Sequence, residues 1–138
     1  MKILLDTNII LDALMLRKPW AESAQSLLLN ITEEKIIGCI TANTITDLYY
    51  LINKHLKNSD ETKKVLLRLF SYIKILDVNS ADCKKAFTLN ISDYEDSLLI
   101  CCAVRHKIDF IVTHNLKDFK NSPIKSISAD DMNAIIAD

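Results

Sequence analysis

Short apolar runs alternate with longer helix-patterned segments along this chain, and this alternation limits the possible folds more than any other feature. Four runs are too short for helices and have no polar face, as is typical of strands buried on both sides. These four runs are 2–5, 35–40, 72–76 and 109–112, and a fifth, weaker run is 125–127. Because strands separated by helices need crossover connections, the pattern predicts a mostly parallel sheet of about five strands, covered by helices on both sides.

Segments with helical periodicity fill the intervals between the apolar runs. Apolar residues recur at the spacing of one helix face from Ile9 to Leu14, and Pro19 stands at a favoured first position of a second helix. The expected helices are 8–16, 19–30, 43–55, 59–71, 80–90, 93–106 and 128–137. We therefore expect one three-layer α/β/α domain over residues 1–138, since domains of roughly 100–150 residues are the commonest.

The composition excludes several kinds of site. Gly38 is the only glycine, so the chain has no glycine-rich loop for a nucleotide phosphate and no glycine-flanked nucleophile. Any phosphate chemistry must therefore depend on side chains and metal. The 17 basic and 18 acidic residues give a net charge of −1, which indicates no particular partner.

The cysteines and the hydropathy pattern bear on the compartment. The thiols lack the spacing of a metal site, and all but Cys83 lie in apolar runs, so we expect them to be buried and reduced. They are Cys39, Cys83, Cys101 and Cys102. No stretch approaches the roughly 20 apolar residues of a membrane span, and no signal-peptide pattern is present. These features favour a soluble, cytoplasmic protein without membrane contact.

Acidic residues follow the predicted elements at several places, which makes them candidates for one shared site. Asp6 comes directly after the first apolar run, at the sheet edge where open α/β folds bind ligands. Helix capping is an alternative role for Asp6, although Thr7 and Asn8 already offer capping oxygens. Asp47 lies one turn into the helix after the second run, where the helix dipole alone also favours an acid.

The segment that begins at Ser92 carries more acids than helix capping needs. Ser92 and Glu95 have the spacing of a capping box, which gives Glu95 a structural role. Asp93 and Asp96 are three residues apart and therefore project from the same helix face. Like charges at that spacing are unfavourable unless a cation lies between them, so this pair favours a functional role.

Polar residues also follow the fourth apolar run. Thr113 and Asn115 stand at its carboxyl end, where their side chains reach the ligand-binding edge of the sheet. Asp118 follows in a turn that it can cap itself, so a structural role stays open for this residue. We expect His114, which lies between Thr113 and Asn115, to be solvent-exposed rather than catalytic.

These motifs together resemble the PIN domain family, and the resemblance covers essentially the whole chain. The matching segments are Leu4–Asn8, Thr46–Tyr50, Asp93–Leu98 and Val112–Phe119, in the order typical of the family. The chain is most similar to the small prokaryotic VapC-type toxins of toxin–antitoxin pairs. The resemblance implies an endoribonuclease, dependent on Mg²⁺ or Mn²⁺, that hydrolyses RNA phosphodiester bonds.

The resemblance also implies roles for individual residues. The expected catalytic residues are Asp6, Asp47, Asp93, Asp96 and Asn115, with Thr113 and Asp118 in support. Because Mg²⁺ keeps several waters and needs only one or two direct carboxylates, we assign Asp6 and Asp96 as direct metal ligands. Asp47 and Asp93 are expected to act through metal-bound water.

Two positions depart from the family pattern. Asp47 stands where many relatives have Glu, so its carboxylate reaches one methylene less far and is expected to contact the metal through water. His114 stands where many relatives have Arg, which weakens the expected contact with phosphate. Both departures lie in motifs that otherwise match.

The resemblance implies two protein partners and leaves an alternative function open. The implied partners are an antitoxin that covers the acidic cleft and a second copy of the chain, with Tyr49 and Tyr50 as candidate interface residues. The alternative is a catalytically weak PIN domain that binds RNA or protein. An aspartyl-phosphate phosphatase is disfavoured, because it needs a second Asp where this chain has Asn8. A receiver domain is disfavoured because neither its paired acid nor its late-strand lysine is evident.

Overall fold

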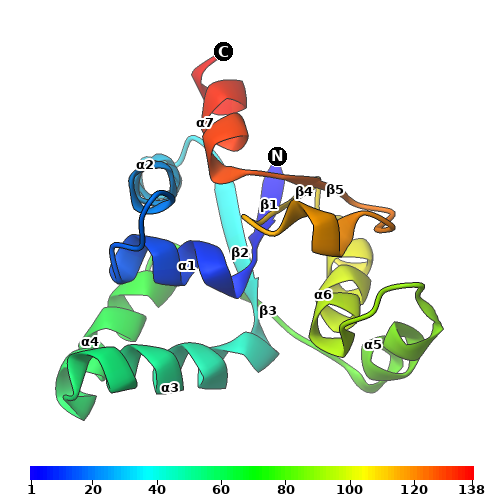
Figure 1. The fold of residues 1–138 in the computed structure, drawn as a ribbon, viewed down its shortest axis with the longest axis horizontal. Coiled ribbons are helices and arrows are strands. Elements are labelled where there is room, and N and C mark those ends of the chain that lie inside the picture. Colours follow the sequence, from blue (N-terminus) through cyan, green and yellow to red (C-terminus); the bar gives the residue numbers. More distant parts are fainter.

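The computed structural model describes residues 1–138, and a parallel sheet with the strand order β3-β2-β1-β4-β5 forms its centre (Figure 1). Its strands are β1 Lys2–Leu5, β2 Ile37–Thr41, β3 Lys74–Leu76, β4 Phe110–Val112 and β5 Lys125–Ile127. On the central strand β1, Ile3 is aligned with Gly38 of β2 on one side and with Phe110 of β4 on the other. The predicted parallel sheet of five strands is confirmed.

Helices connect the strands and cover both faces of the sheet. They are α1 Thr7–Leu14, α2 Ala21–Thr32, α3 Ile45–Leu56, α4 Ser59–Phe70, α5 Ser80–Lys85, α6 Tyr94–Arg105 and α7 Ala129–Ala137. Short 3₁₀ turns occur at η1 Ala42–Thr44, η2 Ala86–Thr88 and η3 Leu116–Phe119. Helices α1–α4 and α7 lie on one side of the sheet, and α5 and α6 lie on the other (Figure 1). The predicted three-layer α/β/α architecture is confirmed.

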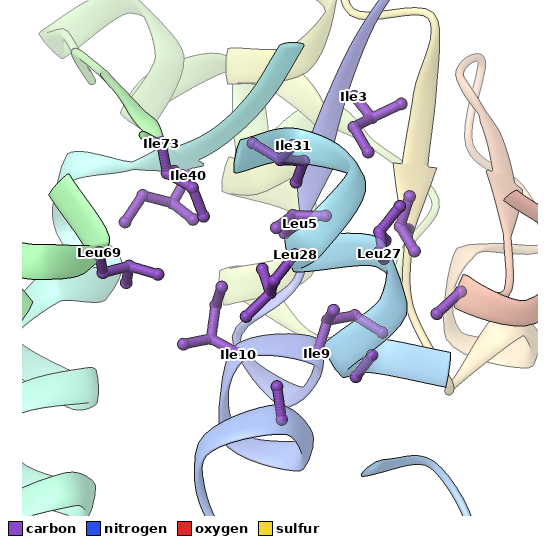
Figure 2. Close-up of a cluster of buried hydrophobic side chains, with 14 of the residues drawn as sticks. Ile3, Leu5, Ile9, Ile10, Leu27, Leu28, Ile31, Ile40, Leu69 and Ile73 are labelled. Atoms are coloured by element: carbon purple, nitrogen blue, oxygen red, sulfur yellow. The ribbon is translucent and has the colours of Figure 1, made fainter. Parts of the chain in front are cut away.

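Successive strand residues point to opposite faces of the sheet, which divides the hydrophobic core in two. Ile3 and Leu5 of β1 belong to a cluster of 21 buried residues with side chains of α1, α2 and α7 (Figure 2). Leu4, which lies between them, belongs to a cluster of 10 buried residues on the face covered by α6. Both faces of β1 are therefore apolar, as its unbroken apolar run predicted.

All cysteines are free thiols, and Cys39, Cys101 and Cys102 are buried while Cys83 is partly exposed. Burial raises the pKa of the Cys102 thiol to about 11, so this group stays protonated near neutral pH and behaves as a small apolar side chain. The expected burial is confirmed for Cys39, Cys101 and Cys102, whereas Cys83 is only partly buried. None of the helices has the length and apolarity that a bilayer crossing requires.

The order of the strands reverses at β1. The chain runs outward from β1 to β2 and β3, and then crosses back to form β4 and β5 on the other side of β1. The backbone N–H of Asp6, just after β1, donates to the carbonyl of Val112 at the end of β4 over 2.9 Å. The residues that follow β1 and β4 therefore meet at the reversal point, where open parallel sheets bind their ligands.

Gly38 on β2 lies against α2, and the packing leaves no room for a side chain. A Cβ at this position would lie 2.5 Å from Cδ1 and 3.0 Å from Cγ1 of Ile31, which is itself only 3% exposed. We expect Gly38→Ala to lower the free energy of unfolding by about 1–2 kcal/mol through overpacking, as measured by urea denaturation. In a chain that also carries Ile31→Val, which removes Cδ1, the combined loss should be smaller than the sum of the single losses. Additive losses would contradict this account.

Candidate active site

Asp6 is the centre of a hydrogen-bond network at the carboxyl ends of β1 and β4. Its Oδ1 accepts from the Thr7 backbone N–H over 2.8 Å, which makes Asp6 the N-cap of α1. Its Oδ2 accepts from the Thr113 hydroxyl over 2.9 Å and from the Asn8 side-chain amide over 3.1 Å. The expectation that Thr7 or Asn8 caps α1 is wrong, because Asp6 caps the helix with one oxygen and binds the neighbouring residues with the other.

Thr113 is fixed on several sides. Besides donating to Asp6, its Oγ1 accepts from the Asn115 backbone N–H over 3.0 Å and from the Asn8 amide over 3.3 Å. Thr113 is fully buried, whereas the side chain of Asn115 is exposed. Thr113 therefore lies within the hydrogen-bond network around Asp6, whereas the Asn115 side chain is exposed to solvent.

The carboxyl group of Asp6 sits in an environment of mixed charge. Burial raises the pKa of Asp6, while the hydrogen bonds from Thr113 and from the Thr7 backbone lower it. The positive charge of His114 also lowers this pKa, and the negative charge of Asp118 raises it. Both of these residues from the segment after β4 are therefore within electrostatic reach of Asp6.

Asp96 lies in the first turn of α6, on the other side of the sheet from α1. Burial and the negative charges of Asp6, Asp93 and Asp118 together raise the pKa of Asp96 to about 7. Because charge–charge effects fall with distance, the direct effect of Asp6 indicates that the two carboxyl groups share one edge of the sheet. The charges of Asp6, Asp93 and Asp118 thus all act on the carboxyl group of Asp96.

The start of α6 differs from the prediction. Asp93 has an extended backbone conformation and is the N-cap of the helix, without a side-chain capping bond. The predicted capping box between Ser92 and Glu95 is therefore wrong, because the helix begins one residue later than that box requires. This register places Asp96 at the third helical position.

Glu95 is a member of the acidic group that the sequence analysis missed. Burial raises the pKa of Glu95, and the charges of Asp47, Asp93 and Asp6 raise it further. Asp47 stands in the first turn of α3, and its effect on Glu95 places it at the margin of the same group. The signal for Glu95 was its position between acids, and the capping-box interpretation obscured it.

Asp12 of α1 is a second missed residue, and its side chain is fully buried. Its Oδ2 lies 2.6 Å from Nδ1 of His114, and its Oδ1 lies 3.3 Å from Nε of Arg17. The His114 ring also stacks on Trp20, with ring centroids 4.0 Å apart and planes inclined by 24°. The expectation of a solvent-exposed His114 is wrong, because Asp12 and Trp20 hold a ring whose side chain is only 14% exposed.

The acidic group offers carboxylate oxygens, the type of ligand that hard cations such as Mg²⁺ prefer. No three carboxyl, imidazole or thiol groups of residues 1–138 are placed as a ready-made metal cluster. Mg²⁺ does not need one, because it keeps several waters and binds through one or two carboxylates. Asp6 and Asp96 provide two carboxyl groups whose pKa values are raised by burial, and a cation beside them would offset both the burial and the repulsion.

Comparisons with known proteins agree on the fold. A family model described as PIN domain matches residues 2–117. The structure is similar to that of VapBC2 from Rickettsia felis bound to a promoter DNA fragment, with a TM-score of 0.71, 21% identity and coverage of 93% of this chain and 98% of that chain. It is also similar to VapBC-1 from nontypeable Haemophilus influenzae, with a TM-score of 0.70, 18% identity and coverage of 94% and 98%.

A third similar structure is VapC20 of Mycobacterium tuberculosis, described as a sarcin-ricin loop cleaving toxin. Its TM-score is 0.63 and its identity 11%, with coverage of 79% of this chain and 86% of that chain. A comparison with curated proteins found no match. At these identities the structural similarities establish the fold alone.

Replacing Asp96 would remove a carboxyl group that is costly to ionise in the folded chain. Its pKa rises from an ordinary 3.8 to about 7 on folding, so the wild type loses stability as the pH rises through the interval between these values. Without divalent cations, we expect Asp96→Asn to raise the free energy of unfolding above pH 7 by about 1–2 kcal/mol, a value discounted for solvent screening. Urea denaturation across this pH range measures the gain.

The gain from Asp96→Asn should disappear below about pH 3, where the wild-type carboxyl is protonated in both the folded and the unfolded state. Asp60→Asn on the exposed face of α4 is the matched control, and it should show no such pH dependence. A gain of equal size at all pH values would contradict the electrostatic explanation.

Proposed function

The chain belongs to the PIN domain family, and we propose that it is a metal-dependent endoribonuclease that acts as the toxin of a toxin–antitoxin pair. The observation that carries the proposal is the group of mutually interacting carboxyls at the carboxyl ends of β1 and β4. The similarity to VapC20, described as a sarcin-ricin loop cleaving toxin, supports a cleavage reaction. In this reaction, a water oxygen bonds to phosphorus as the bond from phosphorus to one ribose oxygen breaks.

Asp6 and Asp96 are proposed to hold one Mg²⁺ or Mn²⁺ ion directly. Such an ion would supply an activated water and would withdraw charge from the phosphodiester. Asp93 and Asp47 would accept hydrogen bonds from water and so orient the attacking molecule. Each of these roles uses a carboxyl oxygen as a metal ligand or as a hydrogen-bond acceptor, and ionisation of the acids strengthens both interactions.

The remaining site residues are proposed to orient these acids and the substrate. Thr113 and Asn8 donate to Oδ2 of Asp6 and so fix the rotation of its carboxylate. The exposed side-chain amide of Asn115 would donate to a phosphate oxygen of the bound RNA. Asp118 is within electrostatic reach of Asp6 and Asp96 and would strengthen the attraction for a cation.

We further propose that an antitoxin covers the acidic edge and that the chain forms a homodimer. The solved VapBC complexes with the same fold support an antitoxin partner. Tyr49 and Tyr50 on α3 are 40% and 63% exposed, so their rings are accessible to a second copy. The alternative is a catalytically weak PIN domain that binds RNA or protein, and the shorter reach of Asp47 favours it.

The cleavage reaction separates the enzyme from the alternative. We expect purified protein to cut single-stranded RNA only when Mg²⁺ or Mn²⁺ is added, and gel analysis of labelled RNA measures the rate. Asp96→Asn should reduce the rate by more than about 100-fold, since loss of even an outer-shell metal partner costs about 10- to 100-fold. Asp60→Asn should cleave like the wild type. Equal rates for Asp96→Asn and the wild type would overturn the proposed function.

Cation binding has a readout that does not depend on activity. Because the folded chain gathers carboxylates that the unfolded chain disperses, millimolar Mg²⁺ or Mn²⁺ should raise the melting temperature. A concentration of about 100 times Kd adds roughly 2.7 kcal/mol of stability. Asp6→Asn should abolish this rise, whereas Asp60→Asn should retain it. A wild-type melting curve that neither cation shifts would contradict the metal site.

A further inference from the structure

Phe87 and Tyr94 form an aromatic pair on the surface beside the acidic group. The side chain of Phe87 is 78% exposed and that of Tyr94 is 37% exposed, although both are large and apolar. Their ring centroids lie 4.4 Å apart, with the planes inclined by 33°. The Tyr94 hydroxyl donates to the carbonyl of Cys83 over 2.7 Å, so Tyr94 is anchored and one side of the Phe87 ring is covered. The rest of the Phe87 ring faces solvent.

The position of the pair relates it directly to the candidate active site. Tyr94 is the first residue of α6, and Asp93 and Asp96 occupy the same helix start. Tyr94 and Asp96 are therefore about 3 Å apart along the helix axis, and because residues two apart on a helix project to opposite sides, they lie on either side of the helix start. An RNA strand that crosses the start of α6 with a phosphate at Asp96 would therefore have to pass over the helix start for a neighbouring base to reach the aromatic pair.

Exposed lysines supply the charge that an RNA backbone needs near these rings. Lys84 and Lys85 precede Phe87 at the end of α5 and are both exposed. On the other side of the loop that leads into α6, Lys117 and Lys120 line a polar cavity of about 220 Å³. The same cavity is lined by Ser92 and Asp118, so it borders the acidic group. Lysines thus precede Phe87 in the chain, and other lysines share the cavity that borders the acidic group.

We propose that the Phe87–Tyr94 pair is a stacking site for an unpaired base of a single-stranded RNA bound across the acidic group. This inference rests on the proposed ribonuclease function and specifies its substrate as RNA with unpaired nucleotides. A base offers its face to an aromatic ring only when it is not stacked inside a duplex. A protein partner fits the surface less well, because lysines are depleted at the centres of protein interfaces.

Binding of labelled RNA to variants at position 87 tests the stacking site. The measurement uses the full chain carrying Asp96→Asn, so that its result does not depend on cleavage, and follows the fluorescence anisotropy of a short RNA of mixed sequence. Phe87→Ala and Phe87→Leu should each weaken binding by about 5- to 100-fold, the range for loss of one base–aromatic contact. Phe87→Trp should bind the RNA at least as tightly as the chain carrying only Asp96→Asn, because a larger ring stacks better.

Two controls distinguish stacking from other effects. Leu29→Ala removes a similarly exposed apolar side chain from the distant helix α2 and should leave binding unchanged. The fluorescence of the Phe87→Trp variant should be quenched by single-stranded RNA more strongly than that of the parent chain, whose only tryptophan is Trp20. A double-stranded RNA of the same sequence should bind with no dependence on residue 87.

Specific outcomes would overturn the inference. The stacking site would be excluded if Phe87→Ala did not weaken RNA binding, or if the chain carrying only Asp96→Asn bound no RNA. RNA binding by Phe87→Leu as tight as that by Phe87→Trp would show that apolar area suffices, which contradicts base stacking. Cleavage by the chain without Asp96→Asn is measured separately, so failure of the proposed function and failure of the stacking site remain distinguishable.

Discussion

Negative charge gathered at a partly buried sheet edge is the constraint on which the rest of this structure depends. Two ionised carboxylates about 5 Å apart repel by roughly 3 kcal/mol at an effective dielectric constant near 20, which is large beside a domain stability of about 5–15 kcal/mol. The chain relieves this cost in two ways. Asp6 is stabilised by hydrogen bonds from Thr7, Asn8 and Thr113, whereas the pKa of Asp96, raised to about 7 by burial and by its acidic neighbours, lets it hold a proton. A bound cation could replace that proton.

The buried Asp12 explains how the segment after β4 is held against α1. Its carboxylate contacts His114 and Arg17, and Trp20 covers the imidazole. The residue just before His114 is Thr113, which donates to Asp6. Removing one partner of a buried ion pair leaves the other charge uncompensated, at a cost of about 3–5 kcal/mol. The contacts of Asp12 therefore couple the position of Thr113 to the packing of α1. His114 is part of this coupling, because it follows Thr113 and contacts Asp12.

The architecture could be predicted from sequence because its determinants are local. The unbroken apolar run of β1 fixes a strand buried on both faces, and the alternation with helices fixes the parallel sheet. The place of Asp6 follows from that topology. Other features depend on contacts between distant segments. Asp12 and His114 are 102 residues apart, and no local pattern pairs them. The start of α6 at Tyr94 and the electrostatic effect of the neighbouring acids on Glu95 likewise follow from tertiary packing. This packing overrode the capping box that the local sequence predicts between Ser92 and Glu95.

The other end of α6 determines where the aromatic pair lies. Arg105 binds Asp82 of α5 through Nε at 3.0 Å and through a terminal guanidinium nitrogen at 2.9 Å. These hydrogen bonds lower the pKa of Asp82, whereas burial and neighbouring acids raise that of Asp96 on the same helix. The charge at Asp82 therefore persists as the pH falls toward its lowered pKa, and it keeps α5 docked on α6 under conditions that protonate Asp96. Because Phe87 lies in η2, which continues from α5, this ion pair helps to keep Phe87 beside Tyr94.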